Sequence, residues 1–269
     1  MRTWFALVAL LCLLSPGTRA ADITTVDDAA RAWSTMEASL LDIPGCVFCL
    51  DAALSPKTLS AGRVTAIEDI AGGLVFTSAT GPLYSDANGG VLVFNYNTNE
   101  TLECNTGFTA LNGTSGLTVL TAHRVMSSWF QNILNLRYYY GSQSSISCVI
   151  GHGTKEYKVA IRRGNIDTPA WAGAPELRTN VFDVYTATAD YATDTAALYL
   201  NAVAATNVVI PGISGAPRDS VAVNCITVGG SNAELPLSGE LTVVAVWNRV
   251  LSPDEIKLAT DILQERMTR

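Results

Sequence analysis

The chain has 269 residues, of which 48% are hydrophobic and 15% charged, and its formal net charge is −7. An acidic chain without a basic cluster argues against nucleic acids and anionic membrane surfaces as partners. The length suits one all-β domain. Few charges among many Thr, Ser, Asn and Ala residues are typical of a large extracellular β-sandwich.

Residues 1–20 have the pattern of a secretory signal peptide. Arg2 supplies the positive start, Phe5 to Leu14 form the apolar stretch, and Thr18-Arg19-Ala20 is a small-residue cleavage site. The apolar stretch is too short to cross a bilayer, although an uncleaved membrane anchor is the alternative. We therefore expect a secreted or cell-surface protein that does not insert into the membrane.

An N-terminal helix is predicted within residues 21–43. Apolar residues recur there at helical spacing, at Ala29, Trp33, Met36 and Leu40, and the pattern ends before Pro44. We expect this apolar face to pack on the sandwich, with pairing between subunits as the alternative.

Residues 44–269 are predicted to form one domain of strands and turns. The predicted strands are Cys46–Leu50, Val91–Phe94, Leu117–Thr121, Asn135–Tyr139, Cys148–Ile150, Tyr157–Ile161, Val181–Thr186, Ala196–Leu200, Val221–Val228 and Leu241–Trp247. Short strands at this density, separated by Gly, Asn, Ser and Pro turns, indicate a sandwich or barrel.

The chain closes with a predicted helix. Ser252 is placed to cap its first amides, Pro253 takes the first helical position, and Glu255 completes a capping box. Apolar residues then follow at helical spacing, at Ile256, Ala259, Leu263 and Met267.

Residues 238–256, SGELTVVAVWNRVLSPDEI, resemble the end of concanavalin A-like (laminin-G-like) jellyroll domains. Further segments resemble that family in order and spacing: Leu50–Leu54 with Gly62–Val64 and Asp69, a hairpin at Val91–Phe94 and Thr101-Leu102, Gly116–Leu120, a hairpin at Ala197–Val203, and Val228–Gly230. The resemblance covers residues 45–265. It implies a two-sheet antiparallel jellyroll that presents a sugar-binding or protein-binding surface. Two departures are Cys49, where the family often has Trp, and Ala202, where glycine is usual.

Removal of Cys12 with the signal peptide would leave an odd number of cysteines. These are Cys46, Cys49, Cys104, Cys148 and Cys225. An exported protein forms disulfides readily, so we expect at most two bridges and at least one thiol free or bonded between molecules. Residues three apart in a strand lie about 10 Å apart, so we expect Cys46 and Cys49 not to bond to each other.

Catalytic patterns are missing from the sequence. Glucanases of the resembled superfamily use a Glu-x-Asp-x-x-Glu strand, whose carboxylates lie about 5.5 Å apart, and no segment has this spacing. Glu68 and Asp69 are adjacent and point to opposite faces, and Glu240 stands alone. The chain also has two histidines beyond the signal peptide, His123 at a strand end and His152 in a turn. No Gly-x-Ser-x-Gly segment supplies a nucleophilic serine that either could activate. We expect no enzyme, with glycan cleavage as a less favoured alternative.

Binding residues are easier to find. Trp171 in a Pro- and Gly-flanked loop, together with Tyr138, Tyr140 and Trp129, could stack on sugar rings, although the tyrosines suit a core equally well.

The resemblance also implies a possible calcium site with Asp183, Asp190 and Asp194 as ligands. Asn99 and Asn112 begin glycosylation sequons.

The sequence therefore predicts a secreted, non-enzymatic recognition domain for a glycan or for a cell-surface or matrix protein. The alternative is a structural subunit of a coat, filament or matrix, which would self-associate.

Overall fold

The computed structural model describes residues 39–98, 100–106, 108–111, 113–128, 131–137, 147–152, 156–162, 170–209, 225–230 and 236–268. These residues belong to one compact unit, Ala38–Arg269. Within them no helix is both long and apolar enough to cross a membrane.

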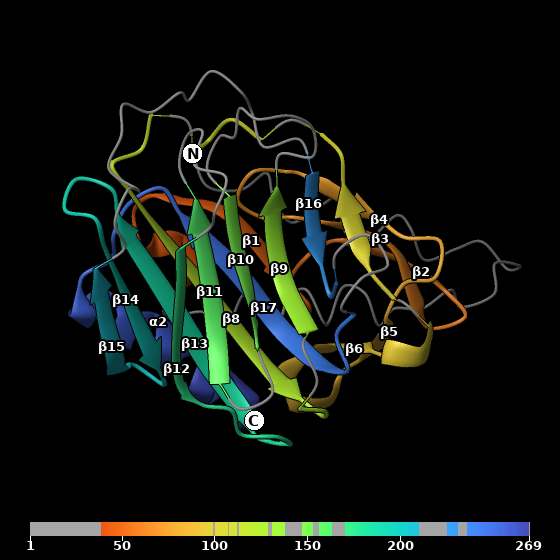
Figure 1. Ribbon diagram of the computed structural model, residues 1–269. Coiled ribbons are helices and arrows are strands. Elements are labelled where there is room, and N and C mark those ends of the chain that lie inside the picture. The colour runs from red at the N-terminus through yellow and green to blue at the C-terminus, as the bar shows by residue number, and fades with distance from the viewer. Residues whose placement is uncertain are drawn as a thin grey trace, which may run out of the picture. The chain divides into compact units, whose positions relative to one another are not determined.

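The described part is an all-antiparallel β structure with one α-helix near its C-terminal end (Figure 1). Its strands are β1 (Cys46–Asp51), β2 (Lys57–Ser60), β3 (Arg63–Glu68), β4 (Val75–Thr77), β5 (Leu83–Ser85), β6 (Val91–Phe94), β7 (Leu102–Cys104), β8 (Gly116–Val125), β9 (Gln131–Arg137), β10 (Ser147–His152), β11 (Glu156–Arg162), β12 (Ala170–Glu176), β13 (Phe182–Asp190), β14 (Thr195–Leu200), β15 (Val203–Val209), β16 (Cys225–Val228) and β17 (Gly239–Trp247). The helices are the short 3-10 turns η1 (Leu40–Asp42), η2 (Ala87–Gly89) and η3 (Tyr96–Thr98), and α2 (Pro253–Met267).

The strands form two layers. One layer runs β15–β14–β13–β8–β17, and β1 and β6 share the free edge of β17. The other runs β12–β11–β10–β9–β16–β7–β4–β3–β2. β5 pairs with both β6 and β3 and so joins the layers at one side. Figure 1 shows β9 to β12 in front of β8, β13 and β17.

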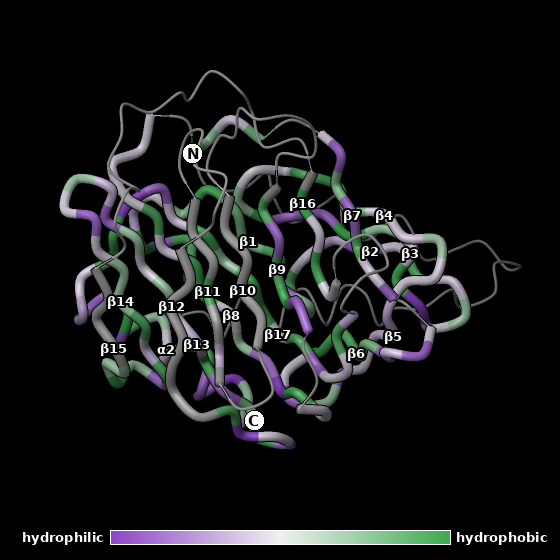
Figure 2. Tube along the Cα trace, in the orientation of Figure 1, coloured by the Kyte–Doolittle hydropathy of each residue, from purple (hydrophilic) through white to green (hydrophobic). Residues whose placement is uncertain are grey.

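Two hydrophobic cores hold this arrangement. The larger core lies between the layers and contains Phe48, Val119 and Tyr185. The smaller lies on the outer face of the first layer, where Trp247 and Cys49 pack beneath Leu263 of α2. Every residue of β17 is buried because one core covers each face of that strand. Figure 2 accordingly shows hydrophobic residues along the central strands and hydrophilic residues at the connecting turns.

Local signals placed the C-terminal helix correctly. Ser252 has extended backbone angles and its hydroxyl accepts the Glu255 amide, while the Glu255 carboxylate accepts the Ser252 amide, so both halves of the capping box form. α2 then buries Ile256, Ala259 and Leu263 against the outer core. The prediction of a capped, amphipathic C-terminal helix is confirmed.

Each predicted strand overlaps an observed one, most of them longer than predicted, although β13 begins after Val181 and residues 221–224 lie outside the described part. The strands β2, β3, β4, β5, β7 and β12 were not predicted. The hairpin predicted at Ala197–Val203 is present as β14 and β15 around Asn201 and Ala202, which have φ angles of 50° and 63°. Two left-handed residues define the tight turn that matches strand twist. Glycine usually fills such a turn, and here Ala202 does so.

Three expectations need correction. A continuous helix to residue 43 is wrong, because Ser39 is extended (φ −121°, ψ 151°) and caps only the short turn η1; residues 21–38 lie outside the described part. Val91–Phe94 and Thr101-Leu102 do not form a hairpin, since β6 pairs with β5 and β17 while β7 pairs with β4 and β16. His152 ends β10 instead of lying in a turn.

Candidate functional site

The aromatic residues predicted to stack on sugars lie mostly outside the described part of the chain. Trp129, Tyr138 and Tyr140 are among the residues that the structure does not describe, as are both predicted glycosylation sites, Asn99 and Asn112. Trp171 lies on β12, in register with Ala160 of β11, so its placement in a loop is wrong. β12 contacts β14 and β15 of the other layer.

Asp183 of the predicted calcium trio is a buried structural anion. Its carboxylate pairs with Arg178 and accepts hydrogen bonds from Tyr157 (3.2 Å) and Asn201 (3.0 Å). Burial raises the pKa of Tyr157, and the adjacent Asp183 carboxylate raises it further, so the phenol stays a donor. His123 is fully buried beside this group, with its ring edge-on to Tyr157 at 5.4 Å.

The structure does not bring the three aspartates together. Asp183 and Asp190 stand seven residues apart on the straight strand β13, which separates them by about 23 Å. Asp190 instead caps the following turn, where its Oδ1 accepts the Ala192 amide at 2.8 Å, and Asp194 lies in that same turn. The three therefore cannot ligate one ion. Among the described residues no group of three His, Cys, Asp or Glu side chains could hold a metal.

Each buried carboxylate of the described residues is held by local hydrogen-bond or ion-pair partners. Four form ion pairs with arginine: Asp51 with Arg266, Glu100 with Arg63, Asp183 with Arg178, and Glu240 with Arg124. The fifth, Asp69, accepts the backbone amides of Cys49, Ala71 and Gly72. In this part of the chain, no buried carboxylate pair stands ready as the acid and nucleophile of a glycosidase.

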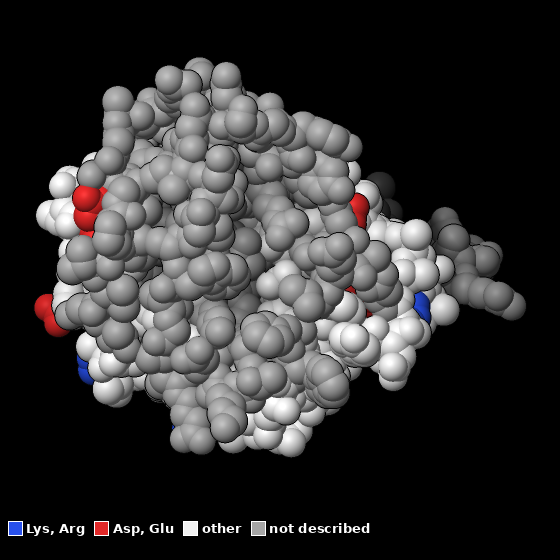
Figure 3. All heavy atoms as spheres, in the orientation of Figure 1, with Lys and Arg blue, Asp and Glu red and all other residues white. Residues whose placement is uncertain are grey.

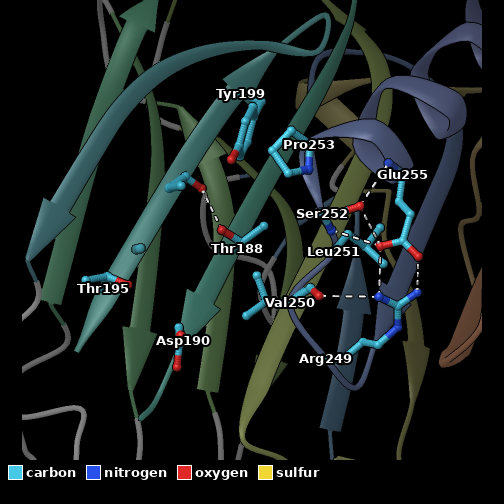
Figure 4. Close-up of a pocket in the computed structure, with 12 residues that line it drawn as sticks. Thr188, Asp190, Thr195, Tyr199, Arg249, Val250, Leu251, Ser252, Pro253 and Glu255 are labelled. Carbon is cyan, nitrogen blue, oxygen red and sulfur yellow. Dashed lines mark hydrogen bonds and ion pairs between the residues drawn. The ribbon is translucent and has the colours of Figure 1, made fainter. Parts of the chain in front are cut away.

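An open pocket of about 560 Å³ lies where the outer face of β13 and β14 meets the start of α2 (Figure 4). Thr188, Asp190, Thr195 and Tyr199 come from the strands. The segment Arg249–Glu255 supplies the opposite side. The volume lies within the usual range for a small-ligand site.

The lining of the pocket mixes apolar, neutral polar and charged side chains. The Thr188 hydroxyl donates to the Ala197 carbonyl (3.4 Å), the Thr195 hydroxyl shares a hydrogen bond with Thr193 (2.9 Å), and Tyr199 offers one half-buried aromatic ring. Asp190 adds a carboxylate whose Oδ1 accepts the Ala192 amide. The charged side chains Arg249 and Glu255 bind each other through two hydrogen bonds of 2.6 and 2.9 Å. Arg249 is the main cause that lowers the pKa of Glu255 to about 2, and the Ser252 amide adds to it. This carboxylate therefore stays ionised and paired at neutral pH, which makes it a poor general acid.

Sequence reasoning missed this pocket. Its two sides are separated by about fifty residues of chain, and the one motif among them, the capping box at Ser252, indicates a helix start and no ligand. Only the pairing of β13 with β8, and of β8 with β17, brings them together. In the described part of the face shown in Figure 3, charged atoms are few and scattered.

Comparison with protein families gives one match. The model described as the concanavalin A-like lectin/glucanases superfamily matches residues 109–257, which is more than half of the chain. No curated protein matches the sequence.

Solved structures of similar fold include the binding domain of paraclostridial mosquitocidal protein 1, with 14% identity and a TM-score of 0.60, covering 83% of this chain and 53% of that one. Botulinum neurotoxin type C, whose cell entry depends on interaction with two ganglioside molecules, is 10% identical with a TM-score of 0.60, over 84% and 52% of the two chains. The botulinum neurotoxin serotype G binding domain is 12% identical with a TM-score of 0.59, over 81% and 51%. This chain spans about half the length of these structures, and likeness at such low identity shows the fold.

Proposed function

This chain belongs to the concanavalin A-like lectin/glucanase superfamily, and from that premise we propose that it is a secreted, non-enzymatic domain that binds carbohydrate. The observation that carries the proposal is the open pocket beside α2, which combines threonine hydroxyls with the ring of Tyr199. An aromatic face covers the apolar side of a sugar ring, while hydroxyls bond to its edge.

Charge favours a neutral or weakly charged glycan as the ligand. Arg249 and Glu255 neutralise each other at the pocket, so no unpaired cation stands there to select an acidic sugar. The toxin binding domains of the same fold support a glycan ligand at the level of architecture, since one of them engages gangliosides, but those glycans are acidic and give no support for a neutral ligand. Trp171 on β12, with Trp129, Tyr138 and Tyr140, remains a proposed second group of stacking residues.

The non-enzymatic part of the proposal rests on the buried carboxylates. Arginines or backbone amides hold each of them in the described part of the chain. A retaining glycosidase needs two carboxyl groups about 5.5 Å apart that are free to exchange protons and attack the sugar. We therefore expect binding without product release.

A glycan array probed with the purified protein, with and without calcium, tests the proposal. We expect binding to a neutral polysaccharide with a Kd between micromolar and millimolar, about 4–8 kcal/mol, because the site is shallow and has one ring. Tyr199→Ala should abolish this binding, and Tyr199→Phe should keep most of it. Tyr96→Ala, which removes an exposed ring outside the pocket, is the matched control.

The outcomes separate the possibilities. Loss of binding in Trp171→Ala but not in Tyr199→Ala would move the site to β12. Release of reducing sugar during long incubation would overturn the non-enzymatic proposal. Absence of binding to every glycan, together with large particles in light scattering, would favour the structural-subunit alternative.

A further inference from the structure

A one-residue bulge puts Cys46 and Cys49 on the same face of β1. In the ladder with β17, Cys46 lies opposite Trp247 and Phe48 opposite Val246, so Val47 is an extra residue without its own partner. Val47 and Phe48 both face the core between the layers. Cys46 and Cys49 both face the outer core beneath α2. The bulge thus reverses the alternation that separates residues three apart in a regular strand.

The register with β17 brings the two cysteines near each other. Cys46 lies opposite Trp247 and Cys49 opposite Ala245, so two strand positions, about 6.7 Å, separate their backbones. The neighbouring Cys49 thiol is the main cause that lowers the pKa of Cys46, whose own thiol donates to the Phe48 carbonyl at 3.5 Å. The Cys46 thiol in turn raises the pKa of Cys49, as do burial and the nearby carboxylates Asp51 and Asp69. The separation of about 10 Å expected from regular strand geometry is therefore wrong, although both cysteines are free thiols in this structure.

The two cysteines differ in how exposed they are to solvent. Cys49 is 1% exposed, and its backbone is fixed because its amide donates to Asp69 (2.6 Å) and its carbonyl accepts from Ile70 (2.9 Å). Cys46 is only partly buried and begins the strand directly after the turn Pro44-Gly45. Gly45 has a φ of 88°, which glycine adopts without strain. Cys46 is therefore the accessible member of the pair, and Cys49 is the buried inner member.

The other cysteine positions lie on three different strands, β7, β10 and β16. Cys104 is a buried free thiol that lies opposite Ile226, one residue from Cys225. The strands of Cys148 and Cys225 flank β9 on its two sides. Two strand spacings separate their backbones by about 9.5 Å, which exceeds the reach of a disulfide.

We propose that Cys46 and Cys49 are a redox-active dithiol that closes to an intrachain disulfide when it meets a disulfide oxidant such as oxidised glutathione. The thiolate of Cys46 attacks one sulfur of the oxidant, forming a mixed disulfide and releasing one glutathione thiolate. Cys49 then attacks the sulfur of Cys46 and displaces the second glutathione. The protein thiols are oxidised, the oxidant is reduced, and the two thiol protons end on the two glutathiones.

The sequence provides a clean readout. Trypsin cleavage after Arg31 and Lys57 yields a peptide, residues 32–57, that contains Cys46 and Cys49 and no other cysteine. After incubation with oxidised glutathione and blocking of free thiols, mass spectrometry should show this peptide unblocked and lighter by two hydrogen atoms.

Variants test the assigned order of attack. Cys49→Ser should accumulate the mixed disulfide of Cys46 with glutathione, because the displacing thiol is absent. Cys46→Ser should not react, since Cys49 is buried. Cys104→Ser is the matched control, which removes a buried thiol elsewhere and should leave peptide 32–57 able to oxidise.

The proposal fails if peptide 32–57 stays a dithiol while the folded protein is exposed to the oxidant. It also fails if Cys46→Ser traps glutathione and Cys49→Ser does not. Circular dichroism of each variant confirms that it is folded. Because these readouts use no glycan, they are independent of the proposed binding function.

Discussion

The guanidinium of Arg266, in the last turn of α2, forms an ion pair of 2.5 Å with Asp51, the last residue of β1. Asp51 is 3% exposed and its other oxygen accepts the amides of Ala53 and Leu54. One carboxylate thus ties the end of the C-terminal helix to the first strand and shapes the turn that follows that strand.

Arg266→Met should therefore destabilise the fold by about 2 kcal/mol, because a charged hydrogen bond to a buried carboxylate is lost while its amide partners remain. Urea unfolding measures the change. Lys257→Met is the matched control on the same helix, since the Lys257–Asp261 pair is exposed and should contribute less than about 1 kcal/mol. Equal effects of the two substitutions would contradict the assignment.

Ala202→Gly should stabilise the protein by about 1 kcal/mol. Ala202 has a φ of 63° in the turn between β14 and β15, and a left-handed conformation costs a residue with a Cβ about that much. Ala204→Gly, two residues later within β15, should instead destabilise, because glycine weakens a strand. Thermal melts of the two variants should shift in opposite directions, and a shared direction would refute the strain argument.

Glu255 should make the fold sensitive to acid between the ordinary glutamate pKa of 4.5 and its folded pKa of about 2. Its folded pKa, about 2, is lower than that of a free glutamate, so the stability it contributes is present above pH 4.5 and is lost as the pH falls toward 2. Carboxyl NMR should place its titration near pH 2. Arg249→Met removes the main cause and should return the titration toward the ordinary value. An unchanged titration in that variant would show that the backbone cap alone controls it.

The elements that depend on neighbouring residues could be predicted from the sequence. The helix start at Ser252 and the β14–β15 hairpin are specified by residues within a few positions of each other. The loop prediction for Trp171 was wrong because it relied on Pro169 and Gly173, which flank this residue and are typical of loops; β12 also contains Pro175. β12 pairs within the described part only with β11, and a strand edge tolerates a proline that a central strand would not.

The pocket and the bulge needed tertiary information. No local signal marks Val47 as an extra residue, because the bulge exists only relative to the register of β17, some 200 residues later. The prediction that three aspartates share one calcium site failed for a different reason. Residues that are close in sequence lie far apart in space when they stand at the two ends of one extended strand. Asp183 faces the inner core and Asp190 reaches the far end of β13.

The bulge at Val47 also bears on how related chains should be compared. Deleting Val47 would leave Cys46 and Cys49 two positions apart on a regular strand, and residues at that spacing still share a face. A relative that keeps the present spacing of the cysteines but pairs this strand regularly, without the bulge, would instead have them on opposite faces and lack the thiol pair. The spacing has to be read together with the strand register, because the presence of both cysteines alone does not specify the pair.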